Sequence, residues 1–131
     1  MAHPNEDRMQ KGFAAYASGD MATLSDLFDE GVTWHQPPGA YEIAGSYRGR
    51  DDAFGMFGRA IELSDGSFAI DVHDVLANDE HGVALVRLTG TRGGRQLDAN
   101  STFVYHFDGD GRVTEAWHLT ADPGTFAEFW S

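Results

Sequence analysis

The sequence predicts an α+β fold in which a curved antiparallel sheet packs against three N-terminal helices. Apolar residues recur at helical spacing in the first half of the chain, whereas from residue 67 onward they alternate with the period of a strand. The strand-like segments are separated by short turns rich in Gly, Asn and Asp, which force neighbouring strands to run antiparallel. Helices that precede a run of strands are typical of α+β domains.

Length, composition and charge set the limits of this fold. A chain of 131 residues with 41% hydrophobic residues can form one domain, residues 1–131, with a core and an apolar pocket. A net charge of -12 disfavours binding to nucleic acid or to anionic membranes. The absence of Cys excludes disulfides and thiol chemistry. Because the polar N-terminus lacks an apolar signal segment, we expect a cytoplasmic protein.

Two helices are predicted at the start of the chain. The first covers residues 5–18, with Asn5 as its N-cap and Gly19 ending it. Asp20 is the expected N-cap of a shorter second helix, whose apolar face extends to Phe28. The two helices therefore meet at a Gly-Asp corner.

A strand and a third helix follow. Residues 32–36 are rich in β-formers, and the Pro-Pro-Gly after them ends the strand. Residues 40–49 are predicted to form a loop with a short edge strand. The third helix is expected from Asp51 or Asp52 to Leu63, and its two internal glycines weaken it and allow close packing.

Four longer strands make up most of the second half. They are predicted at residues 68–77, 83–92, 96–107 and 112–120. A short C-terminal helix then begins at Pro123, with Asp122 as its N-cap. The helices cover one face of the sheet, and the opposite face still carries many apolar side chains. We therefore expect that second face to form a homodimer interface.

Three segments carry a family resemblance. They read DEGVTWHQPPG at residues 29–39, AGSYRGRDDAFGMFGR at 44–59 and DGDGRVTEAWHLTADPGTFAEFW at 108–130. Together with the order of helices and strands, they resemble the SnoaL-like and ketosteroid-isomerase-like proteins of the nuclear transport factor two-like superfamily. The resemblance covers nearly the whole chain and implies a cone-shaped barrel with one apolar pocket. It leaves the reaction open, because that superfamily contains isomerases, polyketide cyclases, epoxide hydrolases, dehydratases and non-catalytic binding proteins.

Hairpin geometry predicts which polar side chains share a face. If Gly93-Gly94 is a two-residue turn, Arg87 lies opposite Asn100. If residues 109–111 form a three-residue turn, Thr102 lies opposite His118 and Asn100 lies opposite Thr120. These five residues would then line one surface. A shift of one residue at the last turn would replace His118 and Thr120 on that surface with Trp117 and Leu119.

Histidines are the first candidates for catalysis. His118 is the best general base, because imidazole has an unperturbed pKa of about 6.5. It is equally consistent with a satisfied histidine on a polar sheet face. His35 lies at a strand exit, where it either overhangs the pocket mouth or bonds to the Pro37-Pro38 turn. The resemblance to SnoaL cyclases implicates a His and an Asp of the last two strands, and the nearest matches are His118 and Asp122.

Other residues are candidates for binding. Arg87 either stabilises a substrate carboxylate or enolate, or forms a salt bridge on the outer face with Asp71 or Asp98. Asp122 is explained more simply as a helix cap than as a catalytic group. The aromatic candidates for the pocket wall exceed the titratable ones. The predicted substrate-binding residues are Trp34, Tyr47, Phe57, Arg87, Asn100, Thr102 and Thr120.

Two functions are consistent with these residues. The first is a cofactor-independent isomerase, cyclase or dehydratase that transfers a proton on a small apolar carbonyl or enol compound, with His118 assisted by His35 or Asp122. The second is a binding module for a small apolar molecule or a partner segment. The sequence has no HxH or HExxH spacing and no phosphate-binding motif, so neither a metal nor a cofactor is expected.

Overall fold

The computed structural model describes residues 3–131, and in that range four helices pack against one six-stranded sheet. The α+β fold class is thus as predicted. Along the chain the elements are α1 (Pro4–Ser18), α2 (Met21–Leu27), β1 (Phe28–His35), β2 (Ser46–Arg48), α3 (Arg50–Leu63), β3 (Ala69–Ala77), β4 (His81–Arg92), β5 (Arg95–Phe107), β6 (Val113–Thr120) and α4 (Pro123–Trp130).

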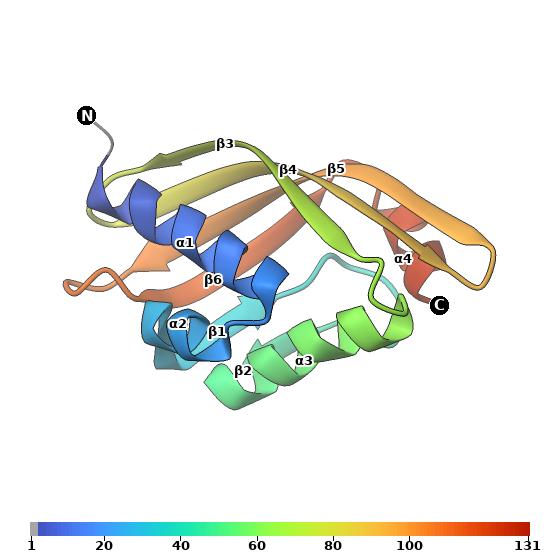
Figure 1. Cartoon of the computed structure of the whole chain (residues 1–131), viewed down its shortest axis with the longest axis horizontal. Coiled ribbons are helices and arrows are strands. Elements are labelled where there is room, and N and C mark those ends of the chain that lie inside the picture. Colours follow the sequence, from blue (N-terminus) through green and yellow to red (C-terminus); the bar gives the residue numbers. More distant parts are fainter. Residues whose placement is uncertain (1–2) are drawn as a thin grey trace.

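The sheet is curved and mixed, and it does not close into a barrel. Its strand order is β2-β1-β6-β5-β4-β3, and strands β3 to β6 form the expected antiparallel meander. β1 pairs with β6 in the parallel direction, which the prediction of an antiparallel barrel missed. β2 and β3 are the two edge strands, and α3 connects them beneath the sheet (Figure 1).

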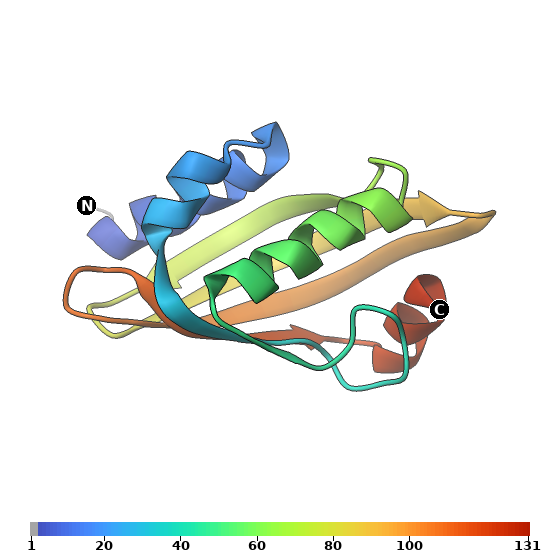
Figure 2. The same cartoon turned by 90° about the horizontal axis from the view of Figure 1, so that it is seen from below.

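Three helices cover the concave face of the sheet, and the fourth packs at one end. α1, α2 and α3 lie under the curve of the long strands (Figure 1). Seen from below, α3 crosses the sheet and α4 lies near the C-terminus, at the end away from the N-terminus (Figure 2). The space between these helices and the sheet contains the core. None of the described helices is long and apolar enough to cross a membrane.

The first helix begins one residue earlier than predicted. His3 is its N-cap, because the His3 ring accepts a hydrogen bond from the Asn5 backbone N–H at 3.0 Å and Glu6 accepts one from the His3 N–H at 2.7 Å. Asn5, the expected cap, is buried instead. Its side-chain amide donates to the Asn78 carbonyl at 3.0 Å and so ties α1 to the β3–β4 turn.

Two helix boundaries also differ from the prediction. Phe28 is the first residue of β1 rather than the end of α2, and its buried ring packs edge-on against Phe54 and Tyr105. α3 begins at Arg50 and has no side-chain cap. Its internal glycines, Gly55 and Gly58, are exposed, and the space where a β-carbon would lie is open at both, so they do not serve close packing as expected.

The β5–β6 register differs from the predicted register by one residue. The β4–β5 hairpin is as predicted, with Arg87 opposite Asn100. In β6, however, Phe107 pairs with Val113 whereas the preceding His106 pairs with Glu115, so Thr114 is an extra residue in a bulge. His118 therefore lies opposite Phe103, not opposite Thr102.

Candidate functional site

An apolar cavity of about 70 Å³ lies between the helices and the concave face of the sheet. Its walls come from α1, α2, α3, β1, β5, β6 and α4 and are almost entirely hydrocarbon. An apolar cavity of roughly 150 Å³ is known to admit benzene. The space is therefore smaller than a ring-sized ligand, and most of the cone is filled by its own side chains.

His118 is the principal titratable group of the cavity wall. It lies on β6, is 4% exposed, and packs against Phe103 and Phe126 with ring centroids 4.6 and 5.0 Å away. Its Nε2 is 2.9 Å from the Ser101 hydroxyl, and its Nδ1 is 3.3 Å from Gln36 Oε1. Both ring nitrogens therefore have a neutral partner.

The neighbouring indole fixes the tautomer of His118. Trp34 Nε1 contacts the same Gln36 Oε1 at 2.9 Å, and because an indole N–H can only donate, this atom must be the amide oxygen. An oxygen that faces Nδ1 requires Nδ1 to carry the proton. Nε2 is then unprotonated and accepts a hydrogen bond from the Ser101 hydroxyl.

Burial keeps His118 neutral. Desolvation lowers the pKa of its imidazole from 6.5 to about 3, because no carboxylate is paired with the ring to stabilise its charged form. The sequence-based expectation of a base near its ordinary pKa is thus not met. A neutral imidazole remains able to donate from Nδ1–H, and the 3.3 Å contact with Gln36 is long enough to be exchanged for a better acceptor.

Helix α1 supplies one long wall of the cavity. Arg8, Met9, Gly12, Phe13 and Tyr16 line it at helical spacing. The Tyr16 hydroxyl donates to the Phe57 carbonyl at 2.9 Å, and burial raises its pKa, so it is occupied and neutral. Arg8 is therefore the one charged side chain on an otherwise apolar helical stripe.

Three predicted site residues meet at the cavity. Trp34, Phe57 and His118 all line it, and the Trp34 and Phe57 rings pack edge-on at 4.7 Å. Tyr47 lies opposite Trp34 in the β1–β2 pair and packs against the core without lining the cavity. Thr120 is on the same strand face as His118, and its buried hydroxyl has no partner among residues 3–131.

His35 lies on the outer face of the sheet, one residue away from the cavity-lining Trp34. Its ring nitrogens contact Ser46 Oγ and Glu115 Oε2, each at 2.7 Å, and its ring stacks on Trp117 at 5.3 Å. It bonds neither to the Pro37-Pro38 turn nor to any group of the cavity. The structure therefore does not bring His35 and His118 together.

Three predicted binding residues also lie on the outer face. Arg87 forms a two-bond ion pair with Asp98, at 2.7 and 2.6 Å, which is the salt bridge that the sequence offered as its alternative role. Asn100 lies opposite Arg87, and Thr102 lies opposite Leu119. The predicted common surface with His118 is wrong, because the bulge in β6 turns His118 to the concave face.

Asp122 is the N-cap of α4. Its carboxylate accepts hydrogen bonds from the Thr125 backbone N–H at 3.1 Å and the Thr125 hydroxyl at 2.6 Å. These bonds hold the pKa of Asp122 below its ordinary value. These capping bonds explain why an Asp occupies this position, and its carboxylate makes no contact with His118.

Sequence reasoning missed the partners of His118 and one further residue of the wall. Gln36 was detectable, because it is two positions after Trp34 and strand alternation places both on one face. The contact between Ser101 and His118 could not be predicted, because it depends on the unpredicted bulge in β6. Arg8 lines the cavity and was also missed. Within residues 3–131 no cluster of three His, Asp or Glu side chains is arranged to hold a metal ion.

The chain belongs to the SnoaL-like family. The SnoaL-like domain model matches residues 9–116, which is most of the chain and includes most of the cavity wall. The resemblance inferred from the sequence is thus confirmed.

Particular relatives agree with this assignment. An uncharacterized protein of Mycobacterium tuberculosis is 33% identical over 126 residues, which is 95% of each chain. The structure of Bal32a, from a soil-derived mobile gene cassette, is 38% identical with a TM-score of 0.92 and covers 97% of this chain and 96% of its own. IdmH, a putative polyketide cyclase from Streptomyces antibioticus, shares the fold at 20% identity, with a TM-score of 0.77 and coverage of 96% and 98%.

Proposed function

We propose that this protein binds a small, largely apolar carbonyl or enol compound in its interior cavity and catalyses cofactor-independent proton transfer on it. The observation that supports this proposal is the neutral His118 on the wall of a largely hydrocarbon cavity. In a dry site a hydrogen-bond donor is worth far more to a developing enolate than it is in water. Isomerase, cyclase and dehydratase chemistry all pass through such an enol or enolate.

In this proposal His118 acts as a hydrogen-bond donor. The substrate oxygen replaces Gln36 Oε1 at Nδ1–H, which polarises the carbonyl and acidifies the neighbouring C–H bond. A solvent water takes the α-proton as the enolate forms, and solvent returns a proton to carbon when the carbonyl is restored. Ser101 keeps Nε2 occupied and so holds the ring in this tautomer. Arg87 and Asn100 have no part in it, because they lie on the opposite face. His35 and Asp122 are likewise left out.

Hydrogen exchange on enolisable ketones tests the proposal. Proton NMR in D₂O follows the loss of α-protons from a panel of aryl and cyclic ketones. We expect exchange above the buffer rate with the wild type and a fall of roughly 100-fold with His118→Gln, since a positioned acid or base contributes about that much or more. His81→Gln on the outer strand surface is the control and should exchange at the wild-type rate. Equal rates in wild type and His118→Gln would contradict the assignment.

A second function is supported by the apolar character of the cavity wall. A wall that is almost entirely hydrocarbon, with a single neutral imidazole, also suits a non-catalytic carrier of an apolar molecule or a partner segment. Calorimetry on the same ketones separates the two functions. Binding without exchange above buffer in the wild type would favour the carrier.

We also propose that the outer face of the sheet forms a homodimer. Leu85 and Leu119 are exposed there by 38% and 54%, and both flank Thr102 in the strand register. Val83, Val104 and Trp117 form the next row. A second copy of the chain would cover this apolar row.

A further inference from the structure

The cavity wall near the β5–β6 turn contains an arginine without an acidic partner. Arg8 is partly buried and lines the cavity beside Met9. Among residues 3–131, no carboxylate lies within ion-pairing distance of its guanidinium. In the same range, Arg59 and Arg87 form ion pairs with carboxylates, and Arg8 is the arginine that lines the cavity. In a chain of net charge -12, an unpaired cation at an apolar cavity requires an explanation.

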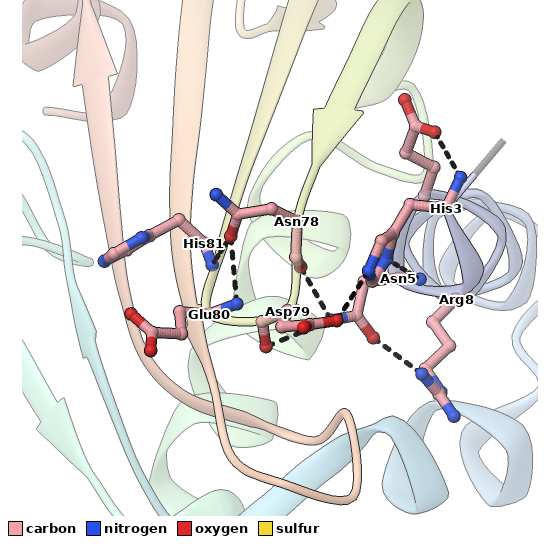
Figure 3. A network of polar contacts seen from close by, with 8 residues as sticks. His3, Asn5, Arg8, Asn78, Asp79, Glu80 and His81 are labelled. Atoms are coloured by element: carbon pink, nitrogen blue, oxygen red, sulfur yellow. Dashed lines mark hydrogen bonds and ion pairs between the residues drawn. The ribbon is translucent and has the colours of Figure 1, made fainter.

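The surrounding structure holds Arg8 in place. Its Nη1 donates to Asn5 Oδ1 at 2.6 Å, and the buried Asn5 is fixed by the β3–β4 turn (Figure 3). The guanidinium also packs on Gly111. A β-carbon at position 111 would clash with the guanidinium, so only glycine leaves space for Arg8 there. Asn5 is a neutral partner and leaves the charge of Arg8 uncompensated.

A second polar group lines the cavity from the sheet. Tyr105 is 6% exposed and lines the cavity, and within residues 3–131 no hydrogen bond joins its hydroxyl to another group. Burial alone raises its pKa, so it stays a neutral donor. Tyr105 lies on β5 between Phe107, which borders Met9, and Phe103, which packs against His118.

We infer that the ligand of this cavity is an amphipathic anion, with a carboxylate or acidic enol held by Arg8 and Tyr105 and an apolar body that reaches toward His118. The inference rests on the proposed function and narrows its substrate class. Phe107, which borders Met9, and Phe103, which packs against His118, are four residues apart on β5, a rise of roughly 13 Å along the strand. Such a ligand exceeds the present space, and the unbranched side chains of Met9 and Met56 form the adaptable part of the wall.

A pair of probes of equal shape tests the inference. Naphthalene-2-carboxylate and 2-acetylnaphthalene differ in that an oxygen anion replaces a methyl group. Calorimetry should show that the wild type binds the carboxylate more tightly than the ketone. Arg8→Gln should lower the affinity for the carboxylate about tenfold or more, as expected for the loss of a charge-assisted hydrogen bond. It should change the affinity for the ketone less than twofold. Arg112→Gln, which removes an equal charge from the exposed side of the same turn, should leave both affinities unchanged.

Two further variants keep the test decisive if Arg8→Gln fails to fold. Arg8→Lys should still bind the carboxylate more tightly than the ketone. Tyr105→Phe should reduce the ratio of the two affinities several-fold. Equal weakening of both probes by these variants, or no preference in the wild type, would overturn the anion site while leaving the proposed function standing. Failure of the wild type to bind either probe would overturn both.

Discussion

At the residue scale, one imidazole links the fold to the proposed chemistry. His118 has its two ring nitrogens fixed by Ser101 and Gln36, and Trp34 fixes Gln36. Each bond is between neutral groups, and burial of the ring away from water keeps it uncharged. The same arrangement couples the stability of the protein to pH.

The low pKa of His118 predicts loss of stability in acid. The unfolded chain binds a proton below about 6.5 that the folded chain accepts only near 3, so the free energy of unfolding falls as pH decreases through this window. The slope from this one group is at most about 1.4 kcal/mol per pH unit. Urea unfolding at several pH values should show a shallower dependence for His118→Gln. An unchanged slope would contradict the neutral buried ring.

At the element scale, the site depends on where α1 meets β4. A β-carbon on Gly82 would lie 2.5 Å from Met9 Sδ and 2.8 Å from a Phe107 ring carbon. The close approach brings α1, and therefore the stripe that contains Arg8, against the sheet. The sequence pattern did not predict this contact, because Gly82 lay between a predicted turn and a predicted strand and was assigned to neither.

A pair of glycine substitutions tests this contact. We expect Gly82→Ala to destabilise the protein by about 1–3 kcal/mol through overpacking. Gly58→Ala, in the exposed and open part of α3, should stabilise it by about 0.5–1 kcal/mol because alanine favours helix. Thermal unfolding of the two variants measures both changes. Equal effects would show that Gly82 is not a packing site.

The elements also show how far sequence reasoning reached. Periodicity predicted the four long strands and three of the helices, because each buries one regular face. It could not predict the Thr114 bulge, which arises from tertiary pairing and turns every later residue of β6 to the other face. The site prediction therefore kept His118 but paired it with Arg87, Asn100 and Thr102, while its partners Gln36 and Ser101 were missed.

At the scale of the whole molecule, the sheet separates two surfaces. The concave face and the helices enclose the cavity, and the outer face presents Leu85, Leu119 and Trp117. Strand alternation assigns Trp117 and His118 to opposite sides. Ligand binding and self-association are thus expected to respond to different substitutions.

The proposed dimer can be tested on its own. Leu119→Lys places a charge in the exposed apolar row and should shift the protein from dimer to monomer in sedimentation experiments. Met21→Lys, on α2 and 44% exposed, is the control and should leave the mass unchanged. A wild type that sediments as a monomer would contradict the proposed interface.

The proposed chemistry depends above all on one contact, in which the donor of the cavity wall, His118 Nδ1–H, faces the oxygen of a bound ligand. Carbon-13 NMR of 2-acetylnaphthalene labelled at its carbonyl measures this contact. We predict a downfield carbonyl shift when the ketone binds the wild type, and a shift like that in an apolar solvent when it binds His118→Phe. Identical carbonyl shifts in the two complexes would contradict the proposed role of His118.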